Sequence, residues 1–99
     1  MEYKMRPDPG VEDNFTYSRY EMPIADGVIA VAYYRIEGEI VILVHTEVPF
    51  EYSGQGIGSL LAQGVFDAIR QSGHKVRPIC PFMAKFAVRH SEYRDMVVW

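Results

Sequence analysis

Three glycines, Gly54, Gly56 and Gly58, alternate just before a helical pattern begins. The first turn of a helix exposes unpaired backbone N–H groups and a partial positive charge, and glycines keep side chains away from them. This arrangement suits an anionic group such as a diphosphate. The alternative is a tight turn with close helix–strand packing, which would use the same glycines.

The loop differs from two widespread nucleotide-binding patterns. It lacks both the Gly-Lys-Ser/Thr ending of the mononucleotide-binding loop and any lysine that could reach a terminal phosphate. It also lacks the spacing of the dinucleotide fingerprint and the acidic residue that follows about 20 residues later. The glycines therefore indicate an anion site of another kind, or a turn.

Cys80 is the only cysteine, and it stands between a short apolar segment and Pro81. Proline suits the first position of a helix, so Cys80 would lie at the front of a second helix. The N–H groups of Phe82 and Met83 would then point toward its sulfur and lower the pKa of the thiol. The alternative is a small, buried apolar side chain.

His45 and Glu47 alternate at the end of an apolar strand, so we expect both side chains on one face, where either could act as a general base. The alternatives are a solvated strand end for Glu47 and a core histidine bonded to backbone for His45. The three histidines lack metal-ligand spacing, and with a single cysteine the sequence predicts no metal site.

The elements that would position these residues follow from periodicity. Residues 13–23, 28–38 and 39–48 are predicted strands, joined by turns at 25–27 and 37–38 into an antiparallel meander. In the first strand, Phe15, Tyr17 and Tyr20 would form one buried face. The third strand has an apolar residue at nearly every position, so we expect it to be covered on both sides. Its predicted faces are Ile40, Ile42, Val44, Thr46 and Val48 on one side and Val41, Leu43, His45 and Glu47 on the other.

The second half of the chain predicts a helix, a strand and a second helix. The first helix has an amphipathic stripe of Ile57, Leu60, Leu61, Gly64, Val65, Ala68 and Ile69. Gly73 would terminate it in the left-handed conformation. Residues 75–79 form a short strand, and the helix after Pro81 would bury Phe82, Met83, Phe86 and Ala87. Residues 91–99 would form a short helix or turn with a docked apolar end. The predicted fold class is α/β, a mixed sheet with element order β-β-β-α-β-α.

Length and composition limit the classes of protein. The 99 residues suffice for one domain, which we expect over residues 11–99 after a flexible lead-in at 1–10. A net charge of −3 argues against a nucleic-acid partner. The sequence contains no run of about 18 apolar residues, so it predicts no membrane span. The N-terminus lacks a signal-peptide pattern, so we expect a cytoplasmic location.

The glycine loop resembles motif A of the GCN5-related N-acetyltransferases (GNAT), Gln/Arg-x-x-Gly-x-Gly/Ala, whose amides hold the pyrophosphate of acetyl-coenzyme A. The matching residues are 53–58, "SGQGIG", with Ser53 in place of Gln or Arg. The resemblance extends to a small single-domain subfamily through "HTEVP" (45–49), "GQGIG" (54–58), "CPF" (80–82) and "HSEY" (90–93), and it covers roughly residues 12–97.

This resemblance implies a reduced acyl-CoA N-acyltransferase fold with an open acceptor groove, and acetyl-CoA as a substrate. The implied coenzyme-binding residues are Val48, Ser53, Gly54, Gln55, Gly56, Ile57, Gly58 and Ser59. The N–H of Val48 would donate to the thioester or the pantetheine arm.

The implied catalytic residues are Cys80, Glu47 and His45. Cys80 would carry the acetyl group or exchange a proton with the coenzyme's sulfur, and Glu47 or His45 would take a proton from the amine. Three functions stay open: an N-acetyltransferase for an amine acceptor, a coenzyme A-binding module without turnover, and a plain interaction domain. Neither the acceptor nor the oligomeric state follows from the sequence.

Overall fold

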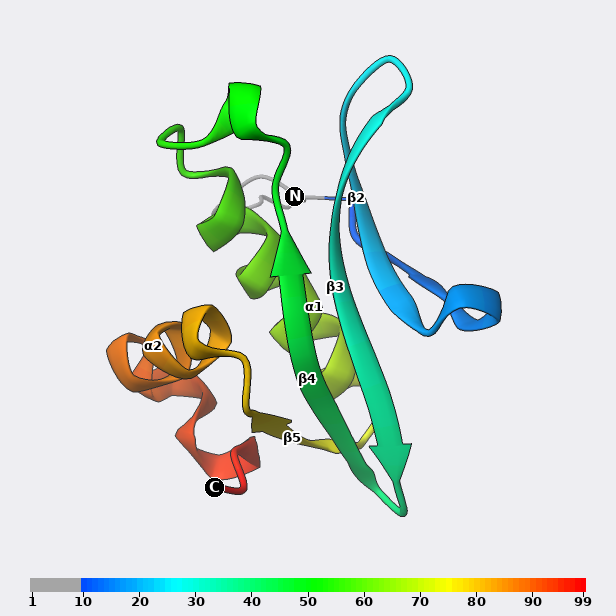
Figure 1. Cartoon of the computed structure of the whole chain (residues 1–99). Coiled ribbons are helices and arrows are strands. Elements are labelled where there is room, and N and C mark those ends of the chain that lie inside the picture. Colours follow the sequence, from blue (N-terminus) through cyan, green and yellow to red (C-terminus); the bar gives the residue numbers. More distant parts are fainter. Residues whose placement is uncertain (1–9) are drawn as a thin grey trace, which may run out of the picture.

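The computed structural model describes residues 10–99. The lead-in predicted for residues 1–10 therefore lies, apart from Gly10, outside the described part of the chain. The described part forms a five-stranded sheet in the order β1-β2-β3-β4-β5 (Figure 1). The strands are β1 Glu12–Asn14, β2 Arg19–Ala25, β3 Val28–Glu37, β4 Ile40–Glu47 and β5 Lys75–Pro78. All neighbours are antiparallel except β4 and β5, which are parallel, so the predicted mixed sheet and its meander are confirmed.

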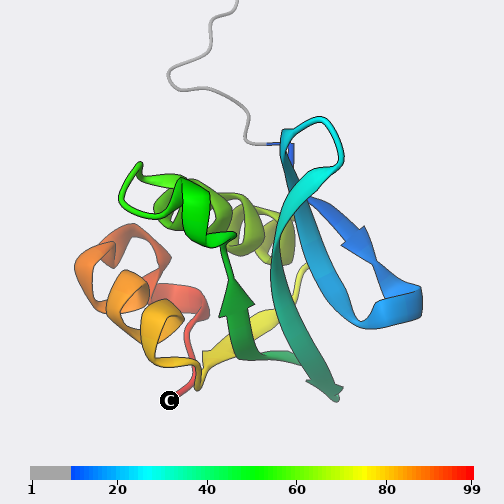
Figure 2. The same ribbon diagram turned by 45° about the horizontal axis from the view of Figure 1, so that its top comes forward.

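Two α-helices, α1 Ile57–Gln71 and α2 Pro81–Arg89, build the core together with one face of the sheet. Three short 3₁₀ helices, η1 Phe15–Tyr17, η2 Phe50–Tyr52 and η3 Ser91–Met96, complete the described elements. In Figure 1, α1 crosses behind β3 and β4 while α2 lies to the left of β4 and β5, and Figure 2 shows the same elements with the top turned forward. No helix within residues 10–99 has the length and apolar character that crossing a membrane requires.

The predicted stripe of α1 is the centre of the core. Leu61, Val65 and Ile69 are fully buried, and Phe66 joins them by packing its ring against Phe86 of α2 with centroids 5.1 Å apart. Burial of side chains this large supplies the main favourable term in folding.

The predicted ends of both helices are confirmed. Gly73 has a φ of 82° directly after α1, and its N–H donates to the carbonyl oxygen of Arg70. The N–H of His74 donates to the carbonyl oxygen of Ile69, which completes a Schellman motif. Pro81 opens α2. These ends set where β5 begins and where the chain turns from β5 into α2.

The prediction of one strand over residues 13–23 is wrong. The side chain of Asn14 accepts a hydrogen bond from the N–H of Tyr17, which closes the η1 turn, and Ser18 then takes a left-handed φ of 52°. The chain reverses there, so β1 and β2 form a hairpin. Phe15 and Tyr17 were expected to be buried, but they lie on the turn with 78% and 63% exposure. Tyr20 is buried as predicted.

A β-bulge in β4 overturns the predicted faces of that strand. Tyr34 pairs with Leu43 and Tyr33 pairs with His45, so Val44 has no counterpart on β3. One extra residue reverses the alternation of all residues that follow it. Val41 and Leu43 belong to the core cluster, and beyond the bulge it is Thr46, not His45 or Glu47, that points to the same side.

The other face of the sheet, which we call the open face, is not covered by a helix from residues 10–99 (Figures 1 and 2). His45 and Glu47 lie on it, together with their β3 partners Tyr33 and Val31. Ile42 is only 2% exposed although it lies outside the core cluster. The expectation that the third strand is covered on both sides is therefore confirmed on the open face only by the burial of Ile42, since no helix of residues 10–99 covers that face (Figures 1 and 2).

The C-terminal segment docks as predicted. Tyr93 and Met96 are buried, and Val97 forms a parallel bridge with Val76 of β5. The N–H of Val98 donates to the carbonyl oxygen of Val76 at 2.8 Å. This segment extends the sheet past the outer edge of β5 and so protects that edge.

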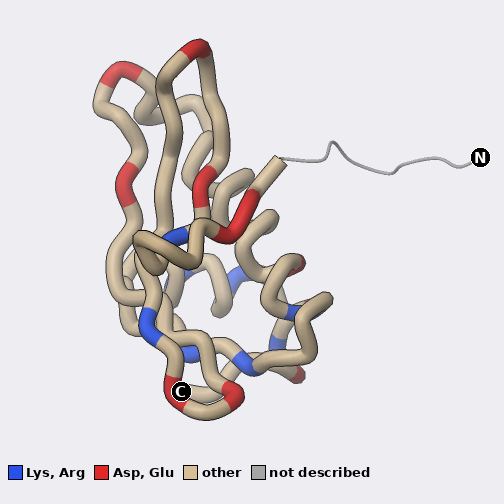
Figure 3. The backbone as a smooth tube through the Cα atoms, turned by 90° about the vertical axis from the view of Figure 1, so that its right-hand side faces the viewer, with Lys and Arg blue, Asp and Glu red and all other residues tan. Residues whose placement is uncertain are grey.

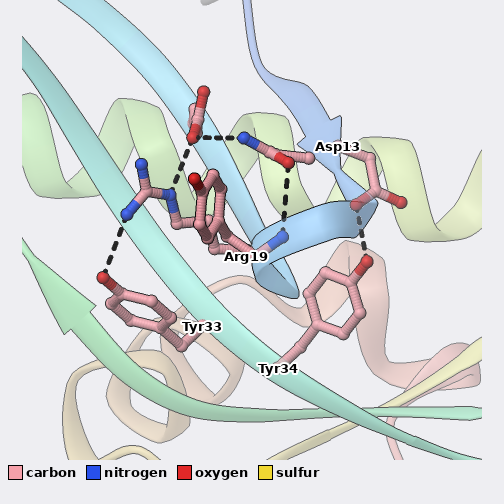
Figure 4. Close-up of polar contacts among 7 residues, drawn as sticks. Asp13, Arg19, Tyr33 and Tyr34 are labelled. Carbon is pink, nitrogen blue, oxygen red and sulfur yellow. Dashed lines mark hydrogen bonds and ion pairs between the residues drawn. The ribbon is translucent and has the colours of Figure 1, made fainter.

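Polar contacts tie β1 to β3 at the far edge of the sheet (Figure 4). The hydroxyl of Tyr34 donates to Asp13 at 2.6 Å, and Arg19 bonds both Glu21 and Tyr33. Burial raises the pKa of Tyr34, and the hydrogen bond to Asp13 raises it further. Burial also raises the pKa of Tyr20. Both hydroxyls are thus held in the neutral form by the fold.

We expect the free energy of unfolding to fall as the pH rises above about 10, because tyrosines of the unfolded chain ionise there while Tyr20 and Tyr34 stay protonated in the fold. Urea unfolding between pH 8 and pH 11 would measure this dependence. The double variant Tyr20→Phe/Tyr34→Phe should show a shallower loss of stability, whereas the exposed Tyr17→Phe should behave like the parent. An equally steep loss in the double variant would show that other groups cause it.

Candidate functional site

The ladder between β4 and β5 ends halfway along β4. It joins Ile40–Leu43 to Lys75–Pro78, and the carbonyl oxygen of Leu43 then accepts hydrogen bonds from the N–H groups of both Ile79 and Cys80. β4 continues to Glu47, while the other chain turns into α2 (Figure 1). We call this divergence the strand split. Along it, no strand of the described residues pairs with the β5 side of β4, so its backbone groups can bond a ligand.

The glycine loop borders a cavity of about 330 Å³ next to the strand split. Gly54 and Gly56 have φ values of 79° and 78°, which favour glycine, and Gly56 is the N-terminal cap of α1. The first helical bond in α1 runs from the N–H of Leu60 to the carbonyl oxygen of Gly56. The preceding N–H groups are therefore free of helical bonds at the front of a 15-residue helix. This geometry fits a diphosphate.

Gly58 has a different role from the other two glycines. A Cβ on it would lie 2.7 Å from Cζ of Phe82, so the side chain is excluded by a ring and not by backbone conformation. Phe82 was predicted to belong to the inner face of α2, but it is 40% exposed and lies over the first turn of α1, whereas Met83, Phe86 and Ala87 are buried as expected. Gly58 thus permits close packing between α1 and α2, rather than the helix–strand packing that was the alternative for this loop.

The predicted coenzyme-binding residues gather around this cavity, with one exception. Its lining consists of Val48, Tyr52, Ser53, Gly54, Gly56, Ile57, Gly58, Ser59 and Phe82. Gln55 is not part of the lining, and its side-chain amide donates to the carbonyl oxygen of Glu51. The hydroxyl and the N–H of Ser53 both donate to the carbonyl oxygen of Phe50. Sequence reasoning missed Tyr52 and Phe82, although both are aromatic residues beside the motifs.

Cys80 lies at the mouth of the strand split and is 6% exposed. Its sulfur is 3.4 Å from the hydroxyl oxygen of Thr46, across the split. It makes no capping hydrogen bond to the N–H groups of α2, so the expected contacts with Phe82 and Met83 do not form. Thr46 was missed because the predicted alternation placed it away from Leu43, and only the bulge turns it toward Cys80.

His45 and Glu47 form a pair on the open face. The Nε2 atom of His45 is 3.1 Å from a carboxylate oxygen of Glu47, and both side chains are 59% exposed. The ring of Tyr33 stacks on His45 with centroids 6.1 Å apart. His45 is therefore not a core histidine. The structure brings this pair together but places it on the opposite side of the sheet from Cys80.

A second cavity, of about 410 Å³, is lined in part by Glu47. Ile29, Thr46, Glu47, Val48 and Pro49 line it. Val48 also lines the glycine-loop cavity, so the two cavities meet at the end of β4. Within residues 10–99, no three side chains of the His, Cys, Asp and Glu types gather in a way that could hold a metal ion. The arrangement offers an anion cradle, a backbone edge, a thiol and an exposed carboxylate–imidazole pair around one strand end.

Comparisons with known proteins found one matching family and a similar solved structure. The model of a family described as GCN5-related N-acetyl-transferase matches residues 19–96. The chain is also similar to the solution structure of a "GCN5-like putative N-acetyltransferase" from Staphylococcus aureus. The two share 20% sequence identity and a TM-score of 0.68, over 94% of this chain and 91% of the other. No curated protein matches the chain.

The contact between Gly58 and Phe82 predicts non-additive effects on stability. Gly58→Ala should lower the free energy of unfolding, because its methyl group displaces the ring of Phe82. In a Phe82→Ala background the same substitution should cost nothing or stabilise, since alanine favours a helix over glycine by about 1 kcal/mol. Urea unfolding of the four proteins of this double-mutant cycle measures the coupling.

Gly54→Ala is the matched control. Its cost arises from the left-handed backbone, and no atom lies within 4 Å of the added Cβ. We therefore expect the same loss in both backgrounds, about 1 kcal/mol. Equal effects of Gly58→Ala with and without Phe82 would contradict the assigned role of that glycine.

Proposed function

The chain belongs to the GCN5-related N-acetyltransferase family, and from this premise we propose that it transfers the acetyl group of acetyl-CoA to an amine. The observation that carries the proposal is the glycine-loop cavity at the front of α1, which meets the unpaired edge of β4 at Val48. A long substrate with a diphosphate at one end and a thioester at the other needs such a continuous site.

The backbone would hold most of the coenzyme. The free N–H groups at the front of α1 suit the diphosphate, with Gly54 and Gly56 leaving space for close approach. The unpaired edge of β4 suits the amide-bearing pantetheine arm, which can bond it as a strand would. The N–H of Val48 is our candidate donor to this arm or to the thioester oxygen, where negative charge builds up during the reaction.

The reaction requires an unprotonated amine. Its nitrogen attacks the thioester carbon, the carbon–sulfur bond breaks, and the coenzyme leaves as a thiolate while the nitrogen gives up a proton. The exposed pair of His45 and Glu47 can accept that proton directly or through water, an effect worth about 10²–10⁴-fold in rate. The second cavity, which Glu47 lines, provides the approach for the amine.

Cys80 has two possible roles at the strand split. In the first, its thiolate attacks the thioester carbon, the coenzyme thiolate leaves, and the amine then takes the acetyl group from Cys80. In the second, its thiol gives a proton to the departing coenzyme thiolate. The hydroxyl of Thr46 lies within hydrogen-bonding distance of the sulfur, so it is a positioning residue for either role.

A second candidate function is a coenzyme A-binding module without turnover. The observation that favours it is the separation of Cys80 from the His45–Glu47 pair by the thickness of the sheet. Such a module would use the same cavity. A plain interaction domain would bind no coenzyme, which makes binding the first property to measure.

Coenzyme A should raise the melting temperature of the protein in a concentration-dependent manner. Ser59→Glu should weaken this binding, because it places a negative charge at the diphosphate site without disturbing the backbone. Ser59→Gln, of similar size but uncharged, should bind nearly as the parent does. An unchanged melting temperature, together with unshifted amide signals of residues 55–59 in NMR spectra, would contradict a coenzyme site.

Release of free thiol from acetyl-CoA, in the presence of mixed polyamines and peptides, would separate the enzyme from the binding module. Once turnover has been measured, Cys80→Ala should abolish turnover if the acetyl group passes through Cys80. In that case, mass spectrometry of a rapidly quenched sample of the parent protein should also find Cys80 acetylated. Cys80→Ala with full turnover would exclude the covalent route. Thr46→Val should lower kcat without weakening coenzyme binding.

A further inference from the structure

The open face carries charges in a fixed order along the strands. One row joins Arg35, Ile42 and Arg77 across β3, β4 and β5, and the guanidinium of Arg35 is 3.9 Å from the carboxylate of Glu37. The next row pairs Tyr33 with His45, and the one after it pairs Val31 with Glu47. The first of these rows is cationic and the last is acidic. On β2, Arg19 lies beside Tyr33 and is paired with Glu21, which lies beside Val31. Figure 3 shows acidic residues without basic ones at the end of the molecule that carries the β2–β3 hairpin.

One nitrogen of the Arg77 guanidinium lacks a hydrogen-bond partner within residues 10–99. Its Nε atom is buried and has no hydrogen-bond partner, and its side chain makes no ion pair with any residue of the described part, 10–99. Its cross-strand neighbour Ile42 is apolar, so the arginine stem is packed against hydrocarbon while the head faces outward. An unsatisfied buried N–H is costly, and a carboxylate satisfies the fork of a guanidinium with two parallel bonds.

The strand split lies beside this row of charges. Beyond the last pair of the β4–β5 ladder, Ile79 follows Arg77 by two residues and is exposed, while His45 and Glu47 occupy the β4 side. A thioester held in the split would meet the open face between the cationic row and the acidic row. An acceptor that reaches it from this face can contact both.

Resting on the proposed function, we propose that the acceptor is a primary amine joined by an aliphatic chain to a carboxylate, with Arg77 binding the carboxylate. The amine lies at His45 and Glu47, and the chain lies over Tyr33 and Ile79. Arg35 and Val31, which mark the two outer rows on β3, are four residues apart, about 13 Å of strand. An α-amino acid is too short to span this distance, whereas an ω-amino acid or a lysine-like compound is long enough once Arg77 and Glu47 reach inward.

The test begins with binding, which does not depend on turnover. 6-Aminohexanoate is titrated into the labelled full chain while the Nε–Hε signal of Arg77 is followed by NMR. Its primary amide, 6-aminohexanamide, differs only in lacking the negative charge. We expect the acid to bind at least tenfold more tightly than the amide and to shift the Arg77 signal. Arg77→Gln should remove this preference, and the control Arg94→Gln, at an exposed arginine of η3, should keep it.

The second arm measures acetyl transfer to both compounds. The preference for the acid should appear mainly in KM, because Arg77 binds a group far from the reacting nitrogen, and Arg77→Gln should raise KM for the acid to about that for the amide. Equal binding of acid and amide, or stronger binding of 1,6-diaminohexane than of the acid, would overturn the proposal. If the acid binds at Arg77 but is never acetylated, the proposed function fails while the carboxylate site stands.

Discussion

The β-bulge at Val44 is the constraint on which the site depends. One residue without a counterpart on β3 sends Thr46 to the core side and His45 with Glu47 to the open face. Without it, the strand would bury a carboxylate–imidazole pair against the helices and expose the threonine. The bulge also stands where the β4–β5 ladder ends, so a single irregularity both orients the side chains and opens the strand edge.

The candidate coenzyme site consists mainly of backbone. Free N–H groups at the front of α1 and the unpaired edge of β4 supply the polar contacts, while Gly54 and Gly56 supply conformations that other residues adopt only under strain. This explains how the loop can match a family pattern while Ser53 replaces the usual Gln or Arg, since the side chain at that position bonds its own turn. On the open face, by contrast, the candidate groups for binding the proposed acceptor are side chains.

The two faces of the sheet differ in what they contact: one packs against the helices of the core, and the other is the open face. On one face, Phe66, Phe86 and Tyr93 pack their rings together and hold α1, α2 and η3 against the strands. On the other face, Ile42 is buried, and the Nε atom of Arg77 has no hydrogen-bond partner within residues 10–99. The buried Nε of Arg77 is costly without a hydrogen bond, which is the observation from which a carboxylate ligand is proposed.

Local pattern by itself determined the α/β class, the meander, the stripe of α1, its glycine terminator and the start of α2 at Pro81, because turn chemistry and periodicity depend only on neighbours in the chain. The glycine loop and the family motifs likewise pointed to the cavity. Only the tertiary structure decided the hairpin at η1, the place of Phe82 over Gly58, and the partner of Cys80. A bulge arises from pairing between strands, so the sequence of β4 alone cannot show which face each residue takes after Val44.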